Sequence, residues 1–200
     1  MNYPVRSALW VLLVGGLALL ATVAWQQFTR KPIADAEQQL QARQLLAVLP
    51  GQSYDNSPLS NPLPLPGAQP PKSRILAAYR ATRGTAATAL ILVSQVQGYA
   101  GPIRLSIAIA ADGRLIGTRV IDQQESPGLG GRISDPQVNW LAQFANRRLD
   151  ARWALKRDQG DFDQLAGATV TSRAVIEAQH DALRYVDQHR TQLLGGRGHD

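Results

Sequence analysis

An uncharged apolar run near the start of the chain constrains its fold most strongly. Residues 8–25 read ALWVLLVGGLALLATVAW, eighteen residues without a charged side chain. At about 1.5 Å per residue, a helix of this length spans roughly 27 Å, close to the hydrocarbon thickness of a bilayer. Trp10 and Trp25 lie near its ends, where indole rings favour the membrane interface. We therefore expect residues 1–30 to form a retained transmembrane anchor.

A cleaved signal peptide is the alternative interpretation of this run. The apolar stretch is long for a signal peptide, and only one basic residue, Arg6, precedes it. Arg30 and Lys31 follow the run, so basic residues flank it on both sides. Because lysine and arginine accumulate on the cytoplasmic side of a span, these charges leave its orientation undecided.

Residues 31–72 are expected to connect this anchor to a folded domain at 73–200. Apolar side chains recur between polar ones from 33 to 48, which indicates an amphipathic helix. The stretch 50–71 holds seven of the twelve prolines. Proline disrupts helices and central strands, so this stretch is expected as an extended connector or a surface lariat.

The domain shows the two-residue alternation of strands, interrupted by a turn signal at Asp112 and Gly113 that predicts a hairpin. The expected strands are 88–97, 103–109 and 115–121, with a further short one at 152–157. The expected helices are 137–148 and 173–193. Strands flanked by helices, without a β-α-β rhythm, indicate an α+β fold with an antiparallel sheet.

Composition excludes several kinds of chemistry. The chain has no cysteine, so it has no thiolate zinc site, cysteine-ligated iron–sulfur cluster or disulfide of its own. Its three histidines lack a metal-site spacing, and no metal is expected. A net charge of +6 favours anionic partners. Nucleic acid is not expected among them, because aromatic residues do not alternate with the basic ones.

Three hydroxyl side chains, Thr169, Thr171 and Ser172, precede the expected last helix in the segment DFDQLAGATVTSRAV. The N-terminus of a helix carries unsatisfied N–H groups and a partial positive charge, which suit a phosphate. Gly167 and Ala168 leave room for a ligand to approach the backbone. The simpler interpretation is that these hydroxyls only cap the helix.

A glycine-rich loop, ESPGLG at 125–130, lies about forty residues upstream. Pro127 fixes a turn, and Gly128 and Gly130 allow the backbone to curl. The loop is neither a GxGxxG dinucleotide fingerprint nor a Walker motif. Taken alone, it is typical of an ordinary turn.

Residues 166–172, AGATVTS, resemble the flavinylation motif (S/T)GATxT of the FMN-binding domain family. In that family the last threonine is joined to flavin mononucleotide (FMN) through a phosphodiester, which implies Thr171 as the attachment point. Gly167, Ala168 and Thr169 match the rest of the motif, and the resemblance implies that they shape the turn at the phosphate. Asp163 matches an acidic residue ahead of the motif and is expected to help attachment.

The upstream loop resembles a second motif of the same family, E-(S/T)-P-G-L-G. The resemblance implies that this loop packs beside the flavin. The residues that it assigns to cofactor binding are Glu125, Ser126, Pro127, Gly128, Leu129 and Gly130. For Glu125, a solvated loop carboxylate is the alternative interpretation.

The layout of nearly the whole chain resembles the family of G-type subunits of Rnf/Rsx ion-translocating electron-transport complexes. The segments that carry it are the single span, AVLP, SYDN, GYAGPI and WALKRDQGDFDQ. It implies a flavoprotein subunit of a bacterial inner-membrane complex, with its domain on the periplasmic side. The implied partners are other membrane subunits of the complex and a flavin transferase during maturation. No catalytic residue is expected, because the flavin supplies the chemistry.

Two other functions remain open from the sequence. A flavin-free, membrane-anchored periplasmic scaffold is one, because Ala166 stands where the motif usually has Ser or Thr. A C-type subunit of a Na⁺-translocating NADH:quinone reductase is the other. That family shares the flavin motif, although its members are typically longer.

Overall fold

The computed structural model describes residues 10, 13–20, 22, 25, 45–49 and 53–195. The chain divides into two units, Met1–Arg43 and Gln44–Asp200. In the first unit, residues 13–20 are helical, and their apolar side chains are exposed. Within the described ranges, no helix has both the length and the hydropathy to cross a bilayer. Most of the anchor expected at 1–30 and of the helix expected at 33–48 lies outside those ranges.

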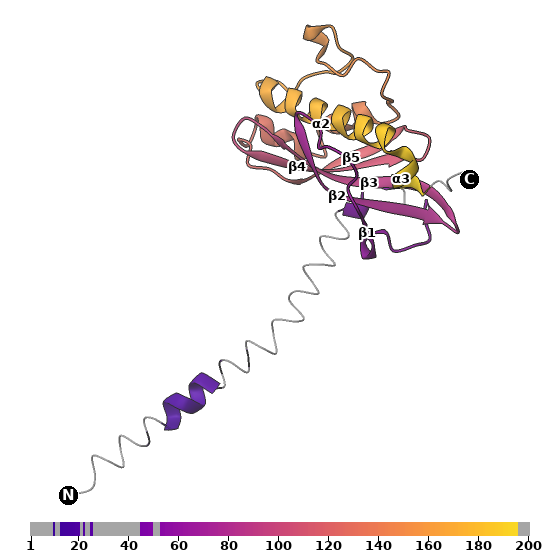
Figure 1. Cartoon of the computed structure of the whole chain (residues 1–200). Helices are drawn as coiled ribbons and strands as arrows, with labels where there is room; N and C mark the ends of the chain where they lie inside the picture. Colours follow the sequence, from indigo (N-terminus) through magenta and orange to yellow (C-terminus); the bar gives the residue numbers. More distant parts are fainter. Residues whose placement is uncertain are drawn as a thin grey trace, which may run out of the picture. The chain divides into compact units, whose positions relative to one another are not determined.

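A five-stranded antiparallel sheet forms the centre of the second unit, with its strands in chain order (Figure 1). The strands are β1 (Pro62–Leu63), β2 (Ser73–Arg83), β3 (Ala86–Gln97), β4 (Pro102–Ala110) and β5 (Leu115–Asp122). The expected hairpin joins β4 to β5, and Gly113 has a φ of +85° in its turn. The sheet and its helices confirm the α+β class.

Both faces of the sheet are buried, as β3 illustrates. Successive residues of a strand point to opposite faces. Leu90 and Leu92 belong to the apolar cluster that includes the last long helix. Ala89 and Ile91 belong to a second cluster, which contains Val48 and Leu49. The continuous apolar run in this strand therefore reflects burial on two sides.

The helix α2 (Thr169–Gln188) crosses one face of the sheet, and the short α3 (Arg190–Leu194) follows it (Figure 1). The sequence predicted a single helix at 173–193. The helix begins four residues earlier than expected, so the hydroxyl-rich segment is its first turn. It ends at Gln188, because the next residue, His189, has a φ of −115° and a ψ of 23°, which are not helical.

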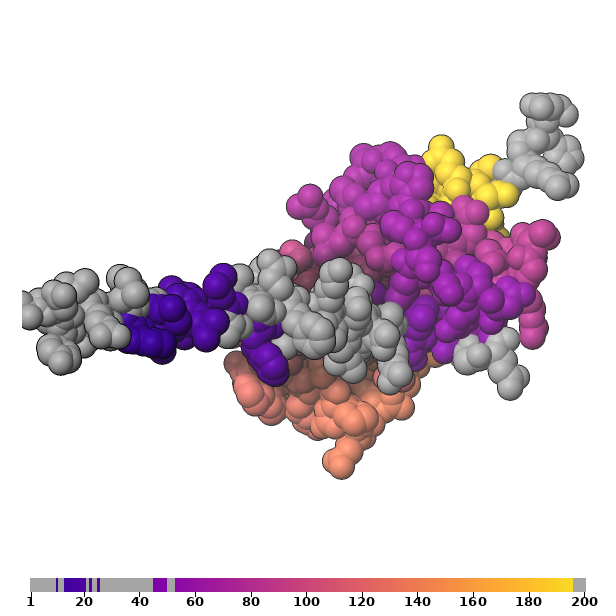
Figure 2. Space-filling model, turned by 90° about the horizontal axis from the view of Figure 1, so that it is seen from below, coloured from indigo at the N-terminus to yellow at the C-terminus, as the bar shows by residue number. Residues whose placement is uncertain are grey.

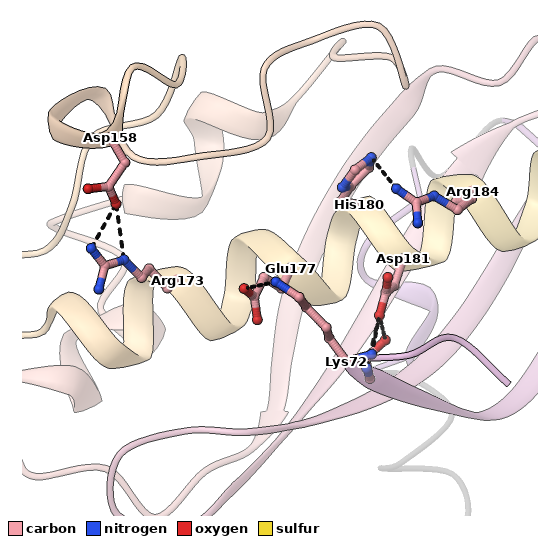
Figure 3. A network of polar contacts seen from close by, with 8 residues as sticks. Lys72, Asp158, Arg173, Glu177, His180, Asp181 and Arg184 are labelled. Carbon is pink, nitrogen blue, oxygen red and sulfur yellow. Dashed lines mark hydrogen bonds and ion pairs between the residues drawn. The ribbon is translucent and has the colours of Figure 1, made fainter.

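Polar contacts join α2 to two neighbouring segments (Figure 3). Asp181 accepts hydrogen bonds from the backbone N–H groups of Lys72 and Ser73, at 3.1 and 2.9 Å, and from the Ser73 hydroxyl at 3.0 Å. Near the first turn of the helix, Arg173 donates two bonds, of 3.0 and 2.8 Å, to the Asp158 carboxylate. The helix is thereby held at both its middle and its beginning.

Residues 123–168, called here the β5–α2 excursion, contain only 3₁₀-helices: η2 (Gly130–Ser134), η3 (Trp140–Phe144) and η4 (Lys156–Asp158). The expected helix at 137–148 is therefore wrong, and so is the expected strand at 152–157, where only a single bridge joins Leu155 to Phe162. Four aromatic side chains, with ring centroids 4.7 to 6.2 Å apart, pack together in their place. They are Trp140, Phe144, Trp153 and Phe162.

The proline-rich segment from residue 53 to 72 is part of the second unit and packs on its sheet and on α2. Its strand β1 pairs with β2, with Pro62 opposite Tyr79. The Tyr185 hydroxyl on α2 donates a 2.8 Å hydrogen bond to the Pro66 carbonyl. In the space-filling view, the purple surface of this segment continues into the magenta surface of the strands (Figure 2). The segment therefore has the form of a surface lariat.

Candidate functional site

Three segments far apart in the sequence meet at one pocket of about 320 Å³. They are the β3–β4 turn, the start of the β5–α2 excursion and the first turn of α2. The residues that line the pocket are Tyr99, Glu125, Ser126, Leu129, Gly130, Gly167, Ala168, Thr169, Val170 and Thr171. The two motifs noted in the sequence are thus brought together.

Thr171 is the third residue of α2, and only 1% of it is exposed. Its hydroxyl donates a 2.5 Å hydrogen bond to Oε2 of Glu125. A carboxylate acceptor makes this a charge-assisted bond, which is shorter and stronger than a neutral one. The hydroxyl therefore lies on the pocket wall and directs its proton at the Glu125 carboxylate.

The neighbouring hydroxyls have different roles. The Ser172 hydroxyl donates to the Ala168 carbonyl at 2.8 Å and accepts from the Leu165 N–H at 3.0 Å. Thr169 donates to the Gln164 side chain at 3.2 Å, near the surface. Only one of the three hydroxyls is therefore paired with a carboxylate. The interpretation that all three serve to cap the helix does not hold for Thr171.

Glu125 is buried, with 6% of its surface exposed, so it is not a solvated loop carboxylate. Its Oε1 accepts a 3.0 Å hydrogen bond from the Ala100 N–H, and its Oε2 accepts the Thr171 hydroxyl. Its own N–H donates to the Gln123 side chain at 2.6 Å. These contacts fix the carboxylate between the β3–β4 turn and α2.

Two glycines border this carboxylate, and their lack of a side chain leaves room for it. A Cβ on Gly130 would lie 2.4 Å from Oε2 of Glu125 and 2.7 Å from the Thr171 hydroxyl oxygen. A Cβ on Gly98 would lie 2.4 Å from Oε1 of Glu125. Contacts this short are sterically forbidden, so either side chain would displace the carboxylate.

The excursion loop reaches the helix through Leu129, which is 48% exposed on the pocket rim. A Cβ on Gly167, whose φ is +74°, would lie 2.8 Å from a methyl carbon of Leu129. The Ser126 carbonyl closes the loop by accepting the N–H groups of Leu129 and Gly131, at 3.2 and 3.1 Å. The predicted Pro127 and Gly128 lie at the loop tip, outside the pocket lining.

Asp163 is not brought to the pocket. Its carboxylate forms a 2.7 Å ion pair with Lys156, and its backbone carbonyl accepts the Trp140 indole N–H at 2.7 Å. Other basic residues of the excursion are similarly paired. Hydrogen bonds from the backbone N–H and the guanidinium of Arg152 hold the pKa of Asp161 below its usual value.

Sequence reasoning did not assign Gly98, Tyr99 or Val170 to the site. Tyr99 is 74% exposed and Val170 is 50% exposed, and both line the pocket. The sequence signal for Tyr99 was the GYAG turn between two strands, where a large aromatic side chain stands between glycine and alanine. The exposed apolar rim suits a planar ligand, because such surface is otherwise costly to leave in water.

The site has the features that a phosphate-bearing cofactor joined to a side chain requires. The acceptor hydroxyl lies in the first turn of a 20-residue helix, whose leading N–H groups lack partners within the helix. Glycine and alanine precede it, so the backbone there is accessible. Among the described residues, no group of three His, Asp or Glu side chains could hold a metal ion. The residues that line this pocket thus fit FMN at Thr171.

Comparisons with known proteins identify the family to which the chain belongs. A family model described as the FMN-binding domain matches residues 98–184, a range that includes both motifs. A Pseudomonas aeruginosa protein, named as the G-type subunit of an ion-translocating oxidoreductase complex, is 43% identical over 188 residues, which cover 90% of this chain and 86% of the relative. A protein of the same name from Cereibacter sphaeroides is 38% identical over 195 residues, covering 96% and 88%.

A solved structure is also similar. NqrC from Shewanella oneidensis has a TM-score of 0.48 and 20% sequence identity, and the likeness covers 57% of this chain and 61% of that one.

Proposed function

Because this chain belongs to the family of G-type subunits of ion-translocating oxidoreductase complexes, we propose that it relays electrons through an FMN joined covalently to Thr171. It is a subunit of an ion-translocating electron-transport complex and not a stand-alone enzyme. The observation that carries the covalent assignment is the Thr171 hydroxyl, which lies on a pocket wall and donates to a buried carboxylate.

The residues around the pocket would hold the cofactor in three ways. Thr171 would carry the phosphoryl group, and Gly167, Ala168 and Thr169 would present the backbone of the helix start to it. Leu129 and the rest of the 125–130 loop would lie beside the ring. Bound FMN would supply reversible one-electron chemistry, while the protein provides its position and surroundings. The covalent link would retain the flavin at an open pocket.

The membrane arrangement is part of the same proposal. The apolar run 8–25 would anchor the chain in the bacterial inner membrane, with the domain on the periplasmic side. Its partners would be the other membrane subunits of the complex, and a flavin transferase would act on it during maturation. Protease added to spheroplasts should then digest the domain, and protection of the domain would contradict this orientation.

A direct test is to express the full chain together with a flavin transferase and view a denaturing gel under ultraviolet light. We expect a fluorescent band and a matching gain in intact mass. Thr171→Val should abolish both while the protein stays folded. Thr191→Val, an exposed threonine-to-valine change in α3, is the matched control and should keep the band. Fluorescence that survives Thr171→Val would refute the assignment.

The flavin-free scaffold is the second candidate, and the observation that favours it is Ala166. This residue is exposed, so replacing the usual Ser or Thr by alanine changes a surface that a transferase would read. A native protein whose intact mass equals that of the bare chain would support the scaffold.

A further inference from the structure

We propose that Glu125 is the general base for flavin attachment, so that the acceptor protein supplies part of the catalysis of its own modification. This inference rests on the proposed function, because it concerns the bond between flavin and Thr171. It assigns a proton-transfer role to a residue that the sequence placed only in the pocket lining.

The geometry of the pair places the base within reach of the acceptor. The Thr171 hydroxyl lies 2.5 Å from Oε2 of Glu125, within the hydrogen-bond distance that a general base requires. The other carboxylate oxygen is occupied by the Ala100 N–H at 3.0 Å. Each carboxylate oxygen thus has one hydrogen-bond donor. The base is therefore oriented before any flavin arrives.

The charge of Glu125 is not balanced by a cation in the described part of the chain. Across residues 53–195, the ion pairs found do not include Glu125. A buried carboxylate without a cation is costly, because burial removes its hydration. The chain could reduce this cost with a neutral side chain at the same position. We therefore assign a chemical role to the buried carboxylate that contacts the acceptor hydroxyl.

Two loops leave space for the carboxylate. Gly98 and Gly130 flank it from opposite segments, and a Cβ on either would lie 2.4 Å from one of its oxygens. The Gly130 side of this space also adjoins the Thr171 hydroxyl. A side chain at position 130 would therefore come between base and nucleophile, and one at position 98 would displace the carboxylate from its other oxygen.

The chemistry balances with one co-reactant. A threonine hydroxyl is a weak nucleophile and needs a neighbouring base. FMN itself would have to expel hydroxide from a phosphomonoester, so the donor must be a pyrophosphate-linked flavin dinucleotide. The Thr171 oxygen forms a bond to the flavin-bearing phosphorus, and the phosphoanhydride bond breaks. The hydroxyl proton passes to Glu125, and the nucleoside monophosphate leaves. No oxidation or reduction takes place.

The experiment follows flavin loading of the purified full chain in detergent, with purified flavin transferase and flavin adenine dinucleotide. Intact mass against time gives the loading rate. We expect Glu125→Gln to lower kcat about 100-fold or more, with little change in the KM for the chain, because general-base catalysis typically contributes 10²–10⁴-fold. Glu177→Gln, the same substitution at a carboxylate of α2 outside the pocket, is the matched control and should load at the wild-type rate.

A pH series separates a base from a merely structural residue. Loading of Glu125→Gln should increase with pH and approach the wild-type rate, because hydroxide can then take the proton. Glu125→Asp keeps a carboxylate but moves it away from the hydroxyl. It should load at an intermediate rate, about tenfold slower than wild type, since misplacing a catalytic group has effects of this order or larger. If Glu125→Gln fails to fold in a thermal melt, Glu125→Asp carries the test.

Different outcomes overturn the two proposals. If the wild-type chain gains no flavin mass on Thr171, the proposed function and this inference fail together. If the wild-type chain loads and folded Glu125→Gln loads equally fast, only the assignment of the base is overturned. A slow Glu125→Gln that high pH does not rescue would also overturn it, because the side chain would then act through structure alone.

Discussion

The sheet and the β5–α2 excursion bury their apolar side chains in different ways. The strands β2 to β5 contribute mainly aliphatic residues, such as Leu92 and Ile107, which repeat every second position and are fully buried. The excursion has no long regular element, and four aromatic rings pack at its centre. Its turns are also fixed by side chains bonding to backbone, as when the indole N–H of Trp140 donates to the Asp163 carbonyl.

The difference matters because the site uses one group from each region. Thr171 is held by α2, which packs on the sheet, whereas Glu125 begins the excursion. The position of the excursion on the sheet therefore sets the distance between hydroxyl and carboxylate. We expect changes in the sheet to alter mainly the free energy of unfolding, and changes in the excursion to alter flavin loading as well.

The largest expected effect comes from removing an aromatic ring. Phe144→Ala should lower the free energy of unfolding by about 3–5 kcal/mol, because Phe144 is fully buried against three other rings and the protein cannot close the cavity. Leu92→Ala in β3 should lower it by about 2–5 kcal/mol. Urea denaturation measures both. Flavin loaded per folded molecule should fall only for Phe144→Ala, and an equal fall for Leu92→Ala would break the comparison.

The same difference explains how much of the fold could be predicted from sequence. The strands β3, β4 and β5 follow the expected ranges closely, because alternation and an Asp-Gly turn are local signals. The strand β2 was not predicted. Register shifts between Ile75 and Ala77, and again between Ala81 and Thr82, interrupt its two-residue period. A bulge of this kind changes which face a residue occupies, so periodicity no longer reports the strand.

The excursion was predicted poorly for another physical reason. Apolar residues at 137–148 suggested a helix, but Phe144 is placed by ring contacts with Trp153 and Phe162 farther along the chain. Trp140 packs on Phe144 and donates its indole N–H to the Asp163 carbonyl. Such tertiary packing overrides local propensity. The site was predicted by resemblance rather than by periodicity, since its central contact joins residues 46 apart in the chain. Asp163 remains a prediction for flavin attachment.

Adding a methyl group, by a glycine-to-alanine substitution, should have a smaller effect that also differs between the two regions. Gly160→Ala would place a Cβ 1.9 Å from the Ala154 carbonyl oxygen in the excursion. Because backbone must move, we expect a loss of about 1–3 kcal/mol in the free energy of unfolding. Gly117→Ala in β5 is the matched control, as its Cβ would make an ordinary 3.5 Å contact with Val48. It should change stability by less than about 1 kcal/mol. Similar losses for the two variants would contradict the comparison.

Matched ion pairs give a smaller effect. Arg173 joins α2 to Asp158 in the excursion, and Arg104 joins β4 to Asp122 in β5. All four side chains are substantially exposed, so Arg173→Gln should cost only about 0.2–1 kcal/mol, and Arg104→Gln should have no more than a similarly small effect. Hydrogen exchange should separate them. Arg173→Gln should speed exchange across 148–163, whereas Arg104→Gln should leave that region unchanged. Unchanged exchange in both would show that aromatic packing alone holds the excursion.

The smallest expected effect is a pH dependence of stability. It arises at His180, where α2 contacts the excursion. This residue of α2 stacks on Trp153 of the excursion, with ring centroids 5.9 Å apart and planes within 5°. Burial lowers its pKa from 6.5, and so do Arg184 and Lys72, against an opposing effect of Asp181.

In the unfolded chain the imidazole recovers its ordinary pKa. Between the lowered pKa and 6.5, the unfolded state therefore binds more protons than the folded one, and stability rises with pH. Acidification through that window should lower the urea midpoint of the wild type more than that of His180→Gln, which has no imidazole to protonate. The excursion should show this loss first, as faster hydrogen exchange around Trp153, because a charged ring would leave the stack. Equal midpoint shifts in the two proteins would mean that acid acts on carboxylates elsewhere and that this contact does not couple the two regions.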